Sequence, residues 1–65
     1  MKYSVYDWVI YRPFANDESE FLREMFYRAL VLDLLKEDLF YDYKIYVEDN
    51  QKIKKVREHQ LFPIS

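Results

Sequence analysis

The sequence predicts a single small α+β domain, residues 1–65, with the order β-α-β-β and one helix packed on a small sheet. Three observations lead to this prediction. Residues 2–12 are rich in aromatic and β-branched side chains, which favour strands. From Asp17 onward, apolar residues recur at helical spacing. Two short segments, residues 42–48 and 52–58, are separated by a polar turn.

The opening strand, residues 2–12, carries large apolar side chains on both of its faces. A strand of that kind is normally covered on both sides. Pro13 cannot donate to a sheet ladder and should end the strand. By alternation, one face would hold Tyr3, Val5, Asp7, Val9 and Tyr11, and the other Ser4, Tyr6, Trp8 and Ile10.

A long helix should follow this strand. Asn16 or Asp17 can cap its start, and acidic residues in the first turn would complement the positive end of the helix dipole. Residues 29–35 are apolar nearly all round, so the end of the helix needs a second surface to bury against. The apolar positions at helical period are Leu22, Met25, Phe26, Ala29, Leu32 and Leu35.

The last third of the chain is interpreted as a hairpin. Residues 42–48 form its first arm, residues 48–51 its turn, and residues 52–58 a second arm charged enough for a sheet edge. The tail, residues 61–64, is kept extended by Pro63. A competing interpretation continues the helix through the first arm, because helical spacing also fits Leu35, Leu39, Tyr43 and Tyr46.

This order of elements has a consequence for the sheet. The first two strands would run parallel through a right-handed crossover. A lone helix can cover one face of the sheet, and the other face would have nothing in this chain to cover it. The sequence therefore predicts an uncovered apolar face.

Composition excludes several kinds of site. Without cysteine the chain has neither disulfides nor Cys-type zinc sites, and the single His59 cannot build a His-based one. Without glycine it has no Walker-type phosphate loop and no dinucleotide fingerprint. No constellation of nucleophile, base and orienting group surrounds His59, which is expected to be a surface residue. We therefore expect no enzyme activity, no cofactor, no metal and no small-molecule substrate.

The aromatic content points instead to binding. The chain holds seven Tyr, five Phe and one Trp, more rings than one small core needs. Exposed Trp and Tyr are common binding hot spots. The sequence thus predicts a small protein–protein interaction or regulatory module that forms a homodimer or binds a larger protein, such as a virus-encoded inhibitor or adaptor. The expected protein interface is Tyr6, Trp8, Ile10 and Tyr46.

Charge supplies two alternatives. Residues 51–65 carry four basic side chains against one acidic, so Lys52, Lys54, Lys55 and Arg57 could contact nucleic acid while tyrosines stack on bases. The acidic side chains of residues 17–42 could mimic nucleic acid toward a basic partner, although a solvated helix face explains them more simply. No segment approaches the roughly 20 apolar residues of a membrane span, and a cytoplasmic location is expected.

Overall fold

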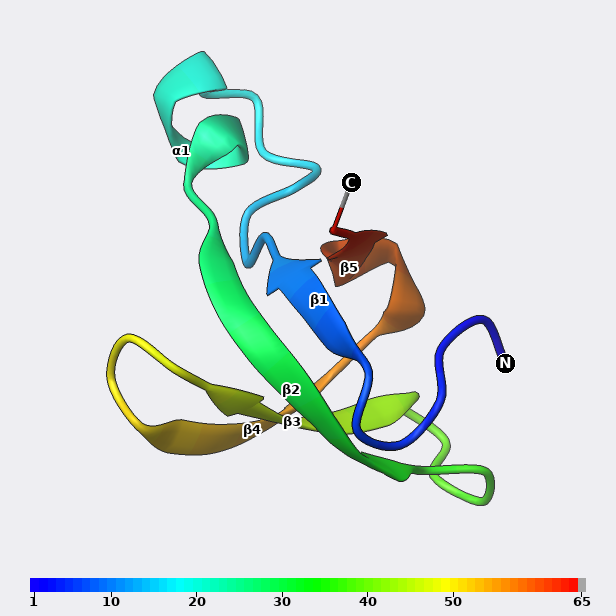
Figure 1. Cartoon of the computed structure of the whole chain (residues 1–65). Helices are drawn as coiled ribbons and strands as arrows, with labels where there is room; N and C mark the ends of the chain where they lie inside the picture. Colours follow the sequence, from blue (N-terminus) through cyan, green and yellow to red (C-terminus); the bar gives the residue numbers. More distant parts are fainter. Residues whose placement is uncertain (65) are drawn as a thin grey trace.

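Five strands form one antiparallel sheet in the order β4-β3-β2-β1-β5 in the computed structural model, which describes residues 1–64 (Figure 1). The chain is a small domain dominated by this sheet, with one short helix. The elements in chain order are β1 (Trp8–Tyr11), α1 (Glu20–Glu24), β2 (Tyr27–Leu34), β3 (Tyr43–Val47), β4 (Lys52–Val56), the 3₁₀ turn η1 (Glu58–Gln60) and β5 (Leu61–Pro63).

The prediction of a long helix is wrong, and so is the predicted β-α-β-β order, because the chain has two further strands, β2 and β5. Helix α1 has five residues, and Met25 ends it in an extended conformation. Its N-cap is Ser19, whose hydroxyl accepts from the Leu22 amide, and not Asn16 or Asp17. The second half of the predicted helix is β2, the central strand. Residues 29–32 of this strand are all apolar, with Ala29 and Val31 buried and Leu30 and Leu32 half-buried, so the same residues also fit a helical period. The register with β3 shifts between Val31 and Asp33.

The predicted parallel pairing is also wrong. Strand β2 lies between β1 and β3, and every neighbouring pair is antiparallel. The predicted hairpin is confirmed as β3 and β4, and β4 lies at a sheet edge. The tail adds a strand that the sequence did not indicate, since β5 pairs with β1 at the opposite edge.

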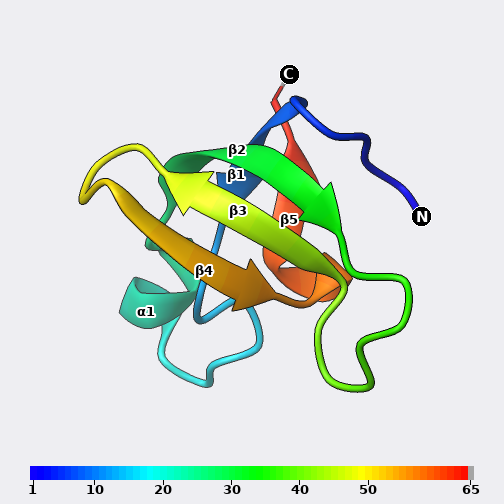
Figure 2. The ribbon, with the colours of Figure 1, turned by 90° about the horizontal axis from the view of Figure 1, so that it is seen from below.

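The sheet covers its own inner face. The sheet is strongly twisted: β2, β3 and β4 run side by side in Figure 2, whereas β4 and β1, which are not neighbours, run in different directions in both views (Figures 1 and 2). No residue of α1 is buried, so a helix does not provide the cover that we expected. The core comes from every strand and from Tyr3: Tyr3, Val9, Tyr11, Ala29, Val31, Tyr43, Ile45, Val47, Val56 and Leu61.

One polar network lies at the margin of this core. The Tyr43 hydroxyl donates to Glu58 Oε1 over 2.6 Å and accepts from the Tyr3 amide over 3.0 Å. The Tyr3 hydroxyl donates to the Leu61 carbonyl. The hydrogen bond from Tyr43, and then that from the Lys2 amide, hold the pKa of the Glu58 carboxyl below its usual range. The network joins the N-terminal segment to β3 and η1.

The turn between β3 and β4 is made without glycine. Gln51 takes a φ of 57°, the left-handed region in which a side chain is sterically disfavoured. The Asn50 side-chain oxygen accepts from the Lys52 amide and stabilises the turn.

Candidate interaction face

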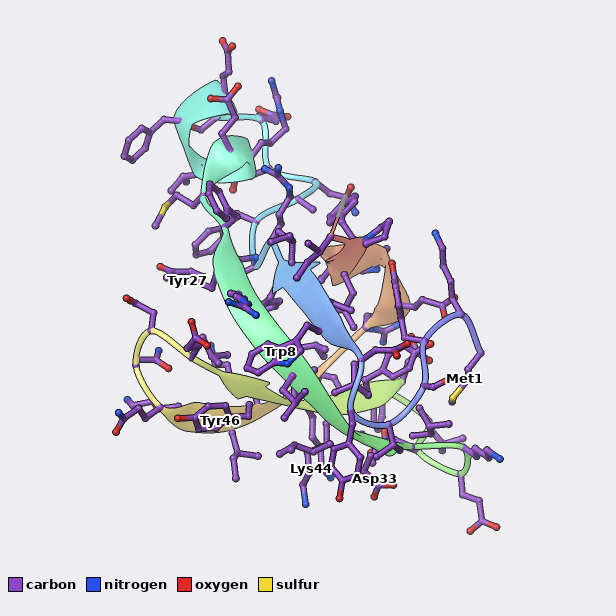
Figure 3. The ribbon with its side chains drawn as sticks, viewed as in Figure 1. Met1, Trp8, Tyr27, Asp33, Lys44 and Tyr46 are labelled. Atoms are coloured by element: carbon purple, nitrogen blue, oxygen red, sulfur yellow. The ribbon has the colours of Figure 1, made fainter. Side chains whose placement is uncertain are left out.

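The outer face of the sheet carries a continuous apolar row across four strands. Side chains in a strand alternate between faces, so the neighbours of the core residues point away from the core. Register aligns Trp8 with Leu30, Leu30 with Tyr46, and Tyr46 with Ile53. We call these four residues the apolar row. Figure 3 shows two of them, Trp8 and Tyr46, on the same side of the sheet.

The apolar row is open to solvent. Trp8 is 39% exposed and Ile53 60% exposed, while Leu30 and Tyr46 are half-buried. Helix α1 lies at the start of β2, beyond the row, and does not cover it (Figure 1). An apolar side chain that stays in water on a sheet face loses the stabilisation that burial would provide, about 1.5–3 kcal/mol when complete.

Charged side chains flank the row on both sides. On one flank the Arg28 guanidinium lies over the Trp8 ring, 4.4 Å from its centroid, and the Glu48 amide donates to the Arg28 carbonyl over 3.0 Å. On the other flank, Asp33 is the register partner of Lys44 (Figure 3). Within residues 1–64 the one ion pair shorter than 4.0 Å is Lys55–Asp38 at 3.5 Å, so none of these four flanking charges is paired within the chain at that distance.

The structure brings together three of the four predicted interface residues. Trp8 and Tyr46 belong to the apolar row. Ile10 lies beside the row on β1, where its register partners are Arg28 on β2 and Phe62 on β5. Tyr6 lies apart from this register, in the turn before β1. Its φ is 71° and its side chain is 73% exposed.

Sequence reasoning missed Leu30 and Arg28 because it assigned both to a helix. Ile53 was recognised as apolar, but its face could not be assigned before the register with β3 was known. A signal for the central strand was present in the alternation of Tyr27, Ala29 and Val31, which all point inward or toward the core.

The predicted basic stretch is divided between two faces. Lys52 and Lys54 are partners of the core residues Val47 and Ile45, and Lys54 Nζ lies 5.8 Å from the centroid of the Tyr11 ring at the open edge of the core. Lys55 points to the outer face, where it pairs with Asp38. All of Lys52, Lys54, Lys55 and Arg57 are exposed, but they do not form one stripe.

Several acidic side chains have local structural roles. The Asp38 carboxylate accepts from the Phe40 and Tyr41 amides, and these bonds lower its pKa. Asp42 accepts from the Glu58 amide, and Asp17 from the Ser19 amide. These acids do not line one helix face, because the long helix does not exist.

The rest of the described chain offers little else that could act as a site. His59 is exposed in η1, and no group of three or more His, Cys, Asp or Glu side chains among residues 1–64 could hold a metal. A shallow hollow of about 280 Å³ adjoins the Arg28 flank of the row, between the start of β2 and the β3–β4 turn. No helix among residues 1–64 has both the length and the apolar character needed to cross a membrane.

Comparison with known proteins identifies a neighbour in fold. No protein-family model matches the chain, and no curated protein sequence matches it. An NMR structure of the Bacillus subtilis protein YorP is similar to this chain, with a TM-score of 0.73 and 22% sequence identity. The similarity covers 100% of this chain and 73% of the YorP chain. At that identity the similarity shows a shared fold.

Proposed function

We propose that this chain is a non-enzymatic protein–protein interaction module that regulates by occupying a surface and that also self-associates. The observation that supports this most directly is the apolar row, which places a Trp and a Tyr together on a sheet face that no other element covers among residues 1–64. Trp, Tyr and Arg are the residues that most often dominate binding energy at interfaces, and Arg28 stacks on Trp8.

The setting that we propose for this activity is the cytoplasm, with a role as an inhibitor or adaptor. A chain without cysteine does not depend on an oxidising compartment. A sheet face also suits inhibition by occupation, because its backbone is already ordered before binding and loses little conformational freedom.

Site-specific photo-crosslinking in the native cells tests the proposal. A photoreactive phenylalanine analogue placed at Ile53, on the outer face, should give discrete protein adducts on irradiation. The same analogue at Phe21, which is 76% exposed on α1, is the matched control and should give few. Equal labelling at both positions, or none at Ile53, would contradict the proposal. Adduct mass separates a second copy of the chain from a different protein.

The same experiment addresses nucleic-acid binding through Lys52, Lys54, Lys55 and Arg57, the alternative to a protein partner. Adducts that nuclease removes would favour it. So would salt-sensitive binding of short DNA or RNA, measured by fluorescence anisotropy and lost on Lys54→Glu/Lys55→Glu. Because the structure divides these side chains between two faces, we favour the protein partner.

A further inference from the structure

Four charges of β2 and β3 around the apolar row alternate in sign, while Lys55 of β4, which also faces outward, is already paired with Asp38. Arg28 and Lys44 are basic, and Glu48 and Asp33 are acidic. The four lie at the corners of a rectangle on β2 and β3, with charges of the same sign at diagonally opposite corners. One flank has Arg28 on β2 and Glu48 at the end of β3. The other has Asp33 on β2 and Lys44 on β3. A surface with this pattern is complementary to itself after a half-turn.

We propose that the outer face binds a second copy of this chain around a two-fold axis that lies between β2 and β3 and runs along them. This inference rests on the proposed function and specifies its self-association. A half-turn about that axis brings β2 opposite β3 of the copy, and β1 opposite β4. Each chain then presents the same patch to the other, as in an isologous dimer.

The axis gives each charge a partner of opposite sign. Arg28 faces Glu48 of the second copy, and Asp33 faces its Lys44. By symmetry each pair occurs twice. These are the four flanking charges that have no ion pair shorter than 4.0 Å within residues 1–64. Opposite charges across the interface fix its register and disfavour other arrangements.

The apolar row matches as well. Leu30 faces Tyr46 of the copy, and Trp8 faces Ile53. A large ring therefore meets a smaller aliphatic side chain at each end of the row, and Trp8 does not meet Trp8. Two sheets that pack face to face keep their strand directions within about 30° of each other, which an axis along the strands allows.

Charge reversal tests this register. Sedimentation equilibrium should show a dimer for the wild-type chain. In a dimer of Arg28→Glu chains, an acidic side chain at position 28 would face Glu48 of the other copy, twice. In a dimer of Glu48→Arg chains, a basic side chain at position 48 would face Arg28 of the other copy, twice. Each variant should therefore dimerise about tenfold more weakly or worse. Glu18→Arg, an exposed site remote from the row, is the matched control and should dimerise as the wild type does.

A mixture of the two variants provides the decisive measurement. In a mixed dimer, the glutamate introduced at position 28 of one chain meets the arginine introduced at position 48 of the other. The native Glu48 of the first chain meets the native Arg28 of the second, so both contacts become attractive. Mixing should restore association to about the wild-type level. The charges within each chain are unchanged on mixing, so an effect on folding cannot explain the recovery.

The second flank repeats the test with Asp33→Lys and Lys44→Glu, should a variant of the first pair fail to fold. Each of these variants should also dimerise more weakly by itself, and mixing them should restore association for the same reason.

Several results would overturn the inference: a wild-type chain that stays monomeric at millimolar concentration, a dimer insensitive to both reversals, or a mixture that does not recover. Recovery from mixing Arg28→Glu with Asp33→Lys would place the axis across the strands and refute this register. A monomeric chain that nevertheless gives adducts with another protein at Ile53 would refute the dimer and leave the proposed function intact.

Discussion

The two faces of the sheet are built from the same strands, yet they have different physical roles. On the inner face, Val31 and Ile45 have no exposed surface, because the twisted sheet packs this face against itself. On the outer face, Trp8 and Ile53 remain in water with charged neighbours. The comparison shows that apolar side chains alone do not identify the core. The direction of sheet curvature decides which apolar face is buried.

The largest expected effect compares one substitution on the two faces. Ile45→Ala removes a fully buried side chain and should lower the free energy of unfolding by about 2–5 kcal/mol. Ile53→Ala, on the neighbouring strand but facing outward, should cost less than about 1 kcal/mol in the monomer. Urea denaturation at low protein concentration measures both. Equal losses would contradict the assignment of inner and outer faces.

The next effect concerns the polar network at the edge of the core. Tyr43→Phe removes the hydroxyl that donates to Glu58 and accepts from the Tyr3 amide. Because both partners then lack that hydrogen bond, stability should fall by about 1–3 kcal/mol. Thermal unfolding by circular dichroism measures the change. Tyr46→Phe is the matched control on the outer face, because the Tyr46 hydroxyl makes no hydrogen bond within residues 1–64, and it should be nearly neutral.

A smaller effect should appear as a pH dependence. The pKa of Glu58 is lowered by the Tyr43 hydroxyl and by the Lys2 amide, so the folded state favours the carboxylate. Its contribution is present above the pKa of the unfolded state and is lost as pH falls through the folded value. Stability should decline on the acid side, and less steeply in Glu58→Gln. An identical acid limb in the two proteins would show that Glu58 is not linked to folding.

The smallest effect belongs to the exposed ion pair on the outer face. Lys55→Ala removes the ion pair in which Lys55 Nζ lies 3.5 Å from Asp38 Oδ2. Exposed pairs of this kind contribute little to stability, and salt screens them. The loss measured by urea denaturation at low ionic strength should be the smallest of the four and should shrink at about 1 M NaCl, where the screening length is only about 3 Å. A loss comparable to that of Ile45→Ala would remove the distinction between the two faces.

The candidate face was predictable in part. Trp8 and Ile10 were expected at an interface because the opening segment is apolar on both sides, and Tyr46 of the first hairpin arm was expected there with them. The structure places these three residues on one face. Their neighbours Leu30 and Arg28 were not expected there. Those two residues come from the segment whose letters fit a helix as well as a strand. The face is formed by pairing between distant strands, which local spacing does not encode.

The sequence by itself determined the end of the first strand before Pro13 and the absence of sites built on cysteine or glycine. It also favoured the hairpin of β3 and β4, with a charged edge at β4, over the competing helix. These features depend on local alternation, turn residues and composition. Only the tertiary structure decided that residues 27–34 are a strand. Ala and Leu favour a helix only weakly, by tenths of a kcal/mol per residue. The hydrogen bonds and packing that β2 gains between β1 and β3 outweigh that preference, and they exist only after the sheet has formed.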